Sequence, residues 1–142
     1  MKSKNYKTIL PQIKTFIFDV DGTLTPSRQA IDKRFAVWFK SFCQSNDVYL
    51  VTGSDRPKTI EQIGETIYNS CNRVYNCNGN DVWEKDINVK TNEWVLPEDA
   101  HEWLSIQLTE SPFKIRTGLH FEHRPGMVNF SIVGRNANPE ER

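Results

Sequence analysis

The strand-like stretch Thr15–Phe18 is followed at once by two aspartates, Asp19 and Asp21, and then by Gly22. Its residues are β-branched or aromatic, and the uninterrupted apolar run predicts a parallel strand that is buried on both faces. Gly22 allows a sharp turn after the strand. Because ligands of open α/β sheets bind outside the carboxyl ends of the strands, we expect the two carboxylates at a functional edge of the sheet.

Two ionised carboxylates this close repel each other unless a cation lies between them. Oxygen ligands in a small site suit Mg²⁺, so Asp19 and Asp21 are candidate magnesium ligands. A carboxylate in such a site can attack phosphorus to form an aspartyl-phosphate, while its neighbour exchanges a proton with the substrate oxygen. The Thr23 hydroxyl and the N–H groups around Gly22 are expected to hold phosphate oxygens. An aspartate–glycine pair can also be a simple turn, but the order of strand, acids, glycine and helix favours a site.

The run Phe18 to Thr25, read as F-D-V-D-G-T-L-T, resembles the first motif of the haloacid dehalogenase superfamily of phosphotransferases. The resemblance implies that Asp19 is the nucleophile, that Asp21 is the acid/base, and that Mg²⁺ is held partly by Asp19.

A second apolar run, Val48 to Val51, ends in Thr52, Gly53 and Ser54. A hydroxyl and a glycine at a strand end, just before a helix, predict a phosphate cradle made by these three residues. The alternative is that Thr52 and Ser54 are only turn and cap residues. Thr52 matches the superfamily's second motif, a Ser or Thr that hydrogen-bonds the phosphoryl group.

The pattern over the first eighty residues is strand, helix, strand, helix, strand, the start of a doubly wound α/β sheet. After about residue 82 the chain is expected to form a hairpin, a helix and then further strands, which is an α+β pattern. We expect a leader at residues 1–12, the first half of a Rossmann-like haloacid dehalogenase core at 13–82, and part of an inserted α+β cap at 83–142. Expected helices cover residues 30–45, 55–69 and 97–110, and expected strands cover 13–19, 48–51, 73–76, 113–116, 119–123 and 127–133, with a hairpin at 82–96.

The 142 residues carry 18 basic and 18 acidic side chains, which argues against a nucleic-acid protein held by a bulk positive field. No stretch is long and apolar enough to cross a membrane. Three cysteines without metal-type spacing, and no secretory segment, predict a cytoplasmic protein.

Three arginines near glycines stand out in the expected cap: Arg124, Arg135 and Arg142. Guanidinium groups at such turns can grip phosphate bidentately, although a single arginine near a turn is usually a solvated surface residue.

The run from Phe121 to Arg142 resembles the cap of eukaryotic-type phosphomannomutases, in which E-F-R-N-G-M-L-N-V-S-P-I-G-R is followed by E-E-R. The core agrees, since Arg28 matches a substrate-contacting arginine of that family. The resemblance implies that Arg28, Arg124, Arg135 and Arg142 bind the substrate. His123 and Pro125 replace the usual Phe and Asn, and Thr52 stands where those mutases often carry Gly.

This family implies an isomerase that interconverts mannose 6-phosphate and mannose 1-phosphate for GDP-mannose biosynthesis, with Mg²⁺ as cofactor. It also implies a hexose bisphosphate activator, a homodimer formed through the cap, and glucose phosphate as a further candidate substrate. Because Thr52 is the more general superfamily residue, a magnesium-dependent sugar phosphatase stays an alternative, as does a non-catalytic phosphosugar-binding fragment.

The superfamily also needs a lysine beside the transferring phosphoryl group and an acidic loop that completes the magnesium shell. Neither motif is evident in the 142 residues, and Lys58 and Lys85 stand in the wrong sequence context for the lysine. We therefore expect an N-terminal part of a mutase-like protein, with little or no turnover by itself.

Overall fold

The computed structural model describes residues 15–138, 140 and 141. Its strands are β1 (Thr15–Phe18), β2 (Asp47–Val51), β3 (Arg73–Asn76), β4 (Asp81–Glu84), β5 (Ile87–Thr91), β6 (Phe121–Arg124) and β7 (Met127–Phe130). Its helices are α1 (Lys33–Ser45), α2 (Arg56–Ile63), α3 (Glu65–Tyr68), α4 (Glu98–Glu110) and the 3₁₀ turn η1 (Cys77–Gly79). In this part of the chain no helix is long and apolar enough to cross a membrane. The expected leader at residues 1–12 lies outside the described residues.

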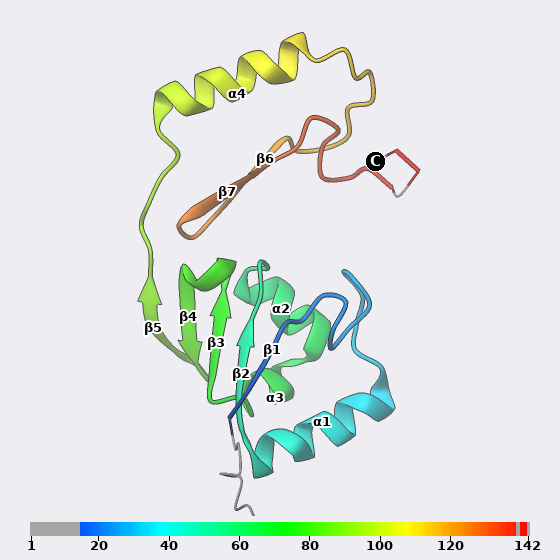
Figure 1. Cartoon of the computed structure of the whole chain (residues 1–142), viewed down its shortest axis with the longest axis vertical. Coiled ribbons are helices and arrows are strands. Elements are labelled where there is room, and N and C mark those ends of the chain that lie inside the picture. Colours follow the sequence, from blue (N-terminus) through cyan, green and yellow to red (C-terminus); the bar gives the residue numbers. More distant parts are fainter. Residues whose placement is uncertain (1–14, 139, 142) are drawn as a thin grey trace, which may run out of the picture.

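Five strands form one sheet in the order β1-β2-β3-β4-β5, and β6 and β7 form a separate hairpin (Figure 1). The first three strands are parallel, which confirms the predicted α/β core and brings the ends of β1, β2 and β3 to one edge. Strands β4 and β5 continue the same sheet in antiparallel order. The sheet thus runs beyond residue 82, and the division into core and cap at that residue stays a prediction.

Helices α1, α2 and α3 pack on one face of this sheet and bury the core. Fully buried side chains include Phe39 from α1, Val48 and Leu50 from β2, and Tyr68 from α3. The rings of Phe16 and Phe18 turn toward α1, where they meet Phe42 and Phe39 edge-on.

The opposite face of the parallel strands is open among the described residues, so the prediction that β1 is buried on both faces is wrong. Ile17 is 69% exposed and Val51 is 41% exposed. An uninterrupted apolar run predicts cover for both faces of the strand, but in the described structure the helices cover only one.

Helix boundaries follow from local capping. Asp32 caps α1 by accepting hydrogen bonds from the N–H groups of Arg34 and Phe35, so the helix begins later than residue 30. The helix expected to run to residue 69 is two helices, because Gly64 lies between α2 and α3 with a φ of 81°, outside the helical range.

The later part of the chain contains α4 and the β6–β7 hairpin, and the hairpin lies between α4 and the large sheet (Figure 1). The predicted strand at 113–116 is wrong. The Arg116 guanidinium instead hydrogen-bonds the carbonyl oxygens of Leu108, Phe113 and Ile115, which folds this segment back onto the end of α4.

We predict that Phe39→Ala lowers the free energy of unfolding by about 3–5 kcal/mol, because it leaves a cavity in the aromatic core. The control is Val37→Ala on the same helix, where the side chain is 70% exposed and the expected change is below about 1 kcal/mol. Urea unfolding of both variants measures the difference. Equal losses would contradict the assignment of Phe39 to the core.

Candidate active site

The loop after β1 is a tight turn whose backbone groups bond to one another. The Gly22 N–H donates to the Thr25 carbonyl at 2.7 Å, and the Thr23 N–H donates to the Val20 carbonyl at 3.3 Å. Gly22 has a φ of 75°, so the turn needs a residue that tolerates this conformation. These N–H groups bond within the turn, and Thr23 is exposed beside them. Their expected role in holding phosphate stays a prediction.

Two donors hold one oxygen of the Asp21 carboxylate. Oδ1 accepts the backbone N–H of Arg28 at 2.7 Å and the side-chain amide of Gln62 at 2.8 Å. Gln62 is 2% exposed and also donates to the Thr25 hydroxyl. Because both of its partners on this side accept hydrogen bonds, the NH₂ end of Gln62 must face them. Asp21 is thus fixed through Oδ1, and its second oxygen is left for other partners.

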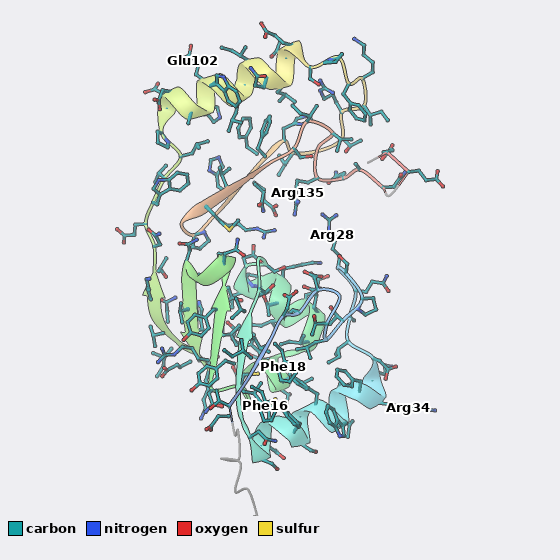
Figure 2. The ribbon with its side chains drawn as sticks, in the orientation of Figure 1. Phe16, Phe18, Arg28, Arg34, Glu102 and Arg135 are labelled. Atoms are coloured by element: carbon teal, nitrogen blue, oxygen red, sulfur yellow. The ribbon has the colours of Figure 1, made fainter. Side chains whose placement is uncertain are left out.

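Arg28 has a φ of 61°, a left-handed conformation that costs a non-glycine residue roughly 1–2 kcal/mol. The hydrogen bond from its N–H to Asp21 fixes this conformation. Its side chain extends from the core toward the space below the hairpin, opposite Arg135 (Figure 2).

The loop after β2 is tied to the end of β3. The N–H of Asn78 donates to the Thr52 carbonyl, and the N–H of Cys77 donates to the Ser54 carbonyl, both at 2.9 Å. The Thr52 hydroxyl accepts the N–H of Ser54 at 3.1 Å and is buried. Asp55 caps α2 by accepting the N–H of Lys58. Thr52 thus stabilises the loop, and whether it also binds phosphate stays a prediction.

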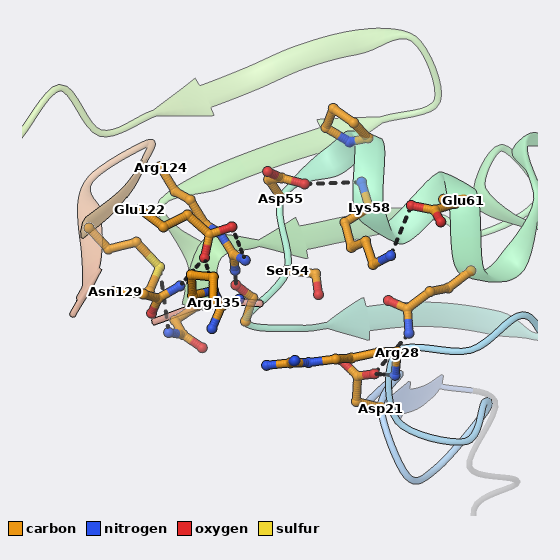
Figure 3. A pocket seen from close by; sticks show the side chains of 15 residues that line it. Asp21, Arg28, Ser54, Asp55, Lys58, Glu61, Glu122, Arg124, Asn129 and Arg135 are labelled. Atoms are coloured by element: carbon orange, nitrogen blue, oxygen red, sulfur yellow. Dashed lines mark hydrogen bonds and ion pairs between the residues drawn. The ribbon is translucent and has the colours of Figure 1, made fainter. Parts of the chain in front are cut away.

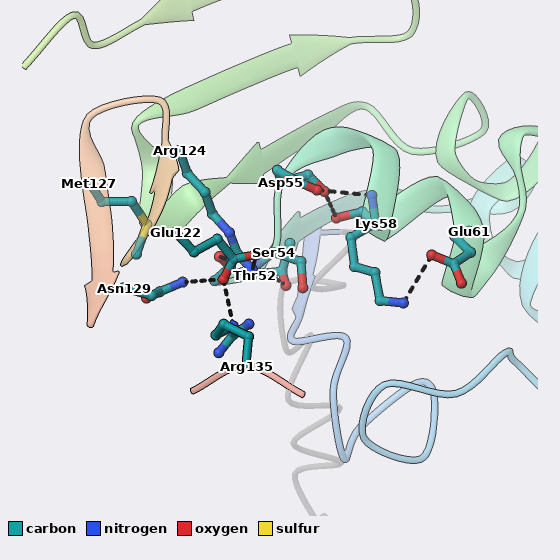
Figure 4. A network of polar contacts seen from close by, with 12 residues as sticks. Thr52, Ser54, Asp55, Lys58, Glu61, Glu122, Arg124, Met127, Asn129 and Arg135 are labelled. Atoms are coloured by element: carbon teal, nitrogen blue, oxygen red, sulfur yellow. Dashed lines mark hydrogen bonds and ion pairs between the residues drawn. The ribbon is translucent and has the colours of Figure 1, made fainter. Parts of the chain in front are cut away.

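The β6–β7 hairpin and the loop that follows it supply a network centred on Glu122 (Figure 4). Arg124 Nη2 lies 3.0 Å from Glu122 Oε1, and Arg135 Nε lies 2.7 Å from Oε2. Asn129 donates to the same Oε2 at 3.3 Å. One carboxylate therefore holds two of the four arginines that the resemblance selects.

Burial raises the pKa of the Glu122 carboxyl, but the hydrogen bonds from Arg124 and Asn129, together with the charges of Arg124 and Arg135, outweigh it. The pKa of Glu122 therefore lies below its usual value. The carboxylate stays ionised at neutral pH and keeps its two guanidinium partners.

Arg124 also joins the hairpin to the core, since its Nη1 donates to the Gly53 carbonyl at 2.6 Å. The hairpin turn lies close by. A Cβ atom on Gly126 would come within 2.7 Å of the Asn80 side chain and 2.8 Å of the Asn92 Cβ. The turn therefore needs glycine for a close approach as well as for its φ of 64°.

Between these parts lies a cavity of about 680 Å³ (Figure 3). Six of the predicted site residues line it: Asp21, Arg28, Gly53, Ser54, Arg124 and Arg135. Three others do not line it: Asp19, Thr23 and Thr52. Arg142 lies outside the described residues. The structure thus brings together residues from both strand-end loops and from the hairpin.

The sequence interpretation missed Gln62, Glu122, Asn129 and Lys58, all of which line the cavity. One signal was available for Glu122: it precedes Arg124 by two residues, and such residues share one face of a strand. No sequence signal joins Gln62 to Asp21, because 41 residues separate them.

No cluster of three or more His, Cys, Asp or Glu side chains that could hold a metal occurs in the described part of the chain. Asp19 and Asp21 nonetheless provide a donor set that suits Mg²⁺, which is often bound by one or two carboxylates and completed by water and phosphate oxygens. Asp19 accepts the Val20 N–H and Asp21 is fixed through Oδ1, so each carboxylate keeps a second oxygen for a cation.

Comparison with known proteins identifies the family. The model of the eukaryotic phosphomannomutases matches residues 36–142. The chain belongs to this family. It is 33% identical to the phosphomannomutase of Spinacia oleracea over 132 residues, which are 89% of this chain and 53% of the relative. It is 30% identical to that of Saccharomyces cerevisiae, over 89% of this chain and 52% of the relative.

The chain therefore spans about half the length of the curated phosphomannomutases that it matches. Among solved structures, a haloacid dehalogenase-like hydrolase from Bacteroides thetaiotaomicron has a TM-score of 0.48 and 21% identity, covering 69% of this chain and 39% of its own. A likeness of this size carries no argument about function.

We predict that Arg28→Gly keeps the free energy of unfolding within about 1 kcal/mol of the original, because glycine accepts the left-handed conformation and retains the N–H bonded to Asp21. The same change should weaken the binding of inorganic phosphate, since it removes a guanidinium group from the cavity. Urea unfolding and calorimetric titration measure the two effects. Arg34→Ala, at an exposed position on α1 that does not line the cavity, is the control.

A second prediction concerns pH. Because the pKa of Glu122 is lower in the folded chain than in the unfolded chain, its network adds stability above the unfolded pKa, and this is lost as the pH falls through the folded pKa. Unfolding free energies measured from neutral to acidic pH should therefore fall more steeply for the original chain than for Glu122→Gln. Parallel curves would show that the network does not contribute.

Proposed function

We propose that this chain carries the nucleophile, the acid/base and the phosphate grip of a mutase that interconverts mannose 6-phosphate and mannose 1-phosphate. One observation supports this most directly. Asp21 lines the cavity from the loop after β1, Arg124 lines it from β6, and Arg135 lines it from the loop after β7. A phosphosugar between them would have one end near Asp21 and the other near guanidinium groups.

Asp19 is the proposed phosphate carrier. When Asp19 is phosphorylated, a sugar hydroxyl attacks the phosphorus atom. The bond between phosphorus and the Asp19 oxygen breaks, and Asp21 accepts the hydroxyl proton. The hexose bisphosphate then turns around. The Asp19 oxygen attacks the other phosphate, and Asp21 returns the proton to the departing sugar oxygen. Atoms and charges balance, because the phosphoryl group and the proton each return to their starting carriers.

The chain's own residues position these groups. The N–H of Arg28 and the amide of Gln62 hold Asp21 through Oδ1, which leaves Oδ2 for the proton. We propose Asp19 and Asp21 as ligands of Mg²⁺, which would offset the negative charge of the phosphoryl group. Glu122 holds Arg124 and Arg135 in place for the distal phosphate.

Further partners follow from the family. A hexose bisphosphate would prime Asp19, and glucose phosphates are a second candidate substrate class. A homodimer through the cap is supported by Trp103 and Ile106 on α4, which are 60% and 44% exposed. Three free cysteines support a cytoplasmic location.

We predict that incubation with a radiolabelled hexose bisphosphate places a hydroxylamine-labile phosphate on the chain, and that Asp19→Asn abolishes this label because the attacking oxygen is gone. Asp99→Asn, on α4, is the control and should keep the label.

Other outcomes separate the alternatives. Release of inorganic phosphate without isomerisation would indicate a sugar phosphatase. Binding of hexose phosphate without any label would contradict the catalytic proposal and leave a phosphosugar-binding protein. A label that survives in Asp19→Asn would refute the assignment of Asp19.

A further inference from the structure

Lys58 lines the cavity, although its sequence context does not match that of the superfamily's lysine. It is the third residue of α2, and its backbone N–H donates to Asp55 Oδ1 at 3.0 Å. The cap thus fixes the direction of the first turn. Lys58 lines the cavity together with Ser54 and Asp21. In both close-up views its side chain lies between Ser54 and Glu61 (Figures 3 and 4).

The present partner of Lys58 is one that a phosphate can replace. Its ammonium group lies 2.9 Å from Glu61 Oε2, and the two side chains are 35% and 70% exposed. Exposed ion pairs three residues apart on a helix are weak and are screened by salt. A phosphate dianion offers more charge and more acceptor oxygens than one exposed carboxylate.

The hairpin arginines are engaged differently. Arg124 is 9% exposed at its side chain and donates to both Glu122 and the Gly53 carbonyl. Arg135 is also paired with Glu122. These contacts are shared and partly buried, so a ligand gains less by displacing them. Of the basic residues that line the cavity, only Arg28 and Lys58 come from the core.

The core side of the cavity needs such a cation. Asp21, Asp55 and Glu61 line it there and repel an incoming phosphate. The Asp55 carboxylate already accepts a hydrogen bond from the backbone of α2. The Lys58 ammonium group, which lines the same cavity as Ser54, would offset this negative charge where a phosphate approaches the loop after β2.

We propose that Lys58 is a phosphate-binding residue of the core side of the cavity, which exchanges Glu61 for a phosphate oxygen when a phosphosugar binds. This inference rests on the proposed binding of hexose phosphate. It adds a residue to the site and assigns Glu61 as its resting partner.

The test compares two lysines. Lys85 is exposed in the β4–β5 turn and does not line this cavity, so Lys85→Met removes the same charge elsewhere. Calorimetric titration with mannose 6-phosphate and, separately, with inorganic phosphate at low salt measures affinity. We expect Lys58→Met to lose about tenfold or more in both titrations, because a charge-assisted hydrogen bond is lost. Lys85→Met should stay within about twofold.

Glu61→Gln separates a binding role from a structural one. It releases Lys58 from its resting partner, so affinity should rise by about two- to fivefold. If Lys58 only braced α2 through this pair, Glu61→Gln and Lys58→Met would lower the unfolding midpoint alike, and affinity would not move in opposite directions. That result overturns the inference.

The outcomes also distinguish this inference from the proposed function. If the original chain binds mannose 6-phosphate and Lys58→Met binds it equally well, the inference fails and the proposed function stands. If the original chain binds mannose 6-phosphate no more tightly than inorganic phosphate, the proposed function fails. A lower affinity of Lys58→Met for inorganic phosphate would still support Lys58 as a phosphate ligand.

Discussion

The hydrogen bonds on Asp21 Oδ1 connect the parts of the core on which the site depends. One comes from the backbone of Arg28, at the far side of the loop after β1, and the other comes from Gln62 in α2. The loop and the helix are distant in sequence, so the Asp21 carboxylate links them structurally, in addition to its proposed role as acid/base. Hydrogen bonds to a charged acceptor are among the stronger ones in proteins. The one from the Arg28 N–H to Asp21 holds Arg28 in its left-handed conformation.

Charge balance explains how the cavity can hold four basic side chains without a ligand. Each of three cations has a carboxylate neighbour, since Lys58 pairs with Glu61 and both arginines of the hairpin share Glu122. Unpaired guanidinium groups this close would repel one another. The pairs differ in exposure, so they differ in how readily a phosphate can replace the carboxylate. The more exposed Lys58–Glu61 pair is the one that a phosphate would replace most easily.

Local patterns predicted the order of strands, turns and helices at this edge of the sheet well, because an apolar strand, a glycine turn and the start of a helix are each set by neighbouring residues. The end of β1 just before Asp21 and the start of α2 just after Ser54 are examples. What the sequence could not show depends on distant contacts. The exposed face of Ile17, the irregular segment around Arg116 and the contact of Gln62 with Asp21 follow from which segments meet in space.

Local departures from ideal structure cluster at the cavity. Of the four buried side-chain polar atoms without a hydrogen-bond partner in the described chain, Gln62 Oε1 and Arg124 Nε belong to residues that line it. Each such atom costs about 1–3 kcal/mol, and the left-handed Arg28 adds to this. A fold optimised only for stability would avoid these features. Two of these residues, Arg28 and Gln62, bond to Asp21, so the surrounding contacts there maintain an arrangement that local energetics disfavour.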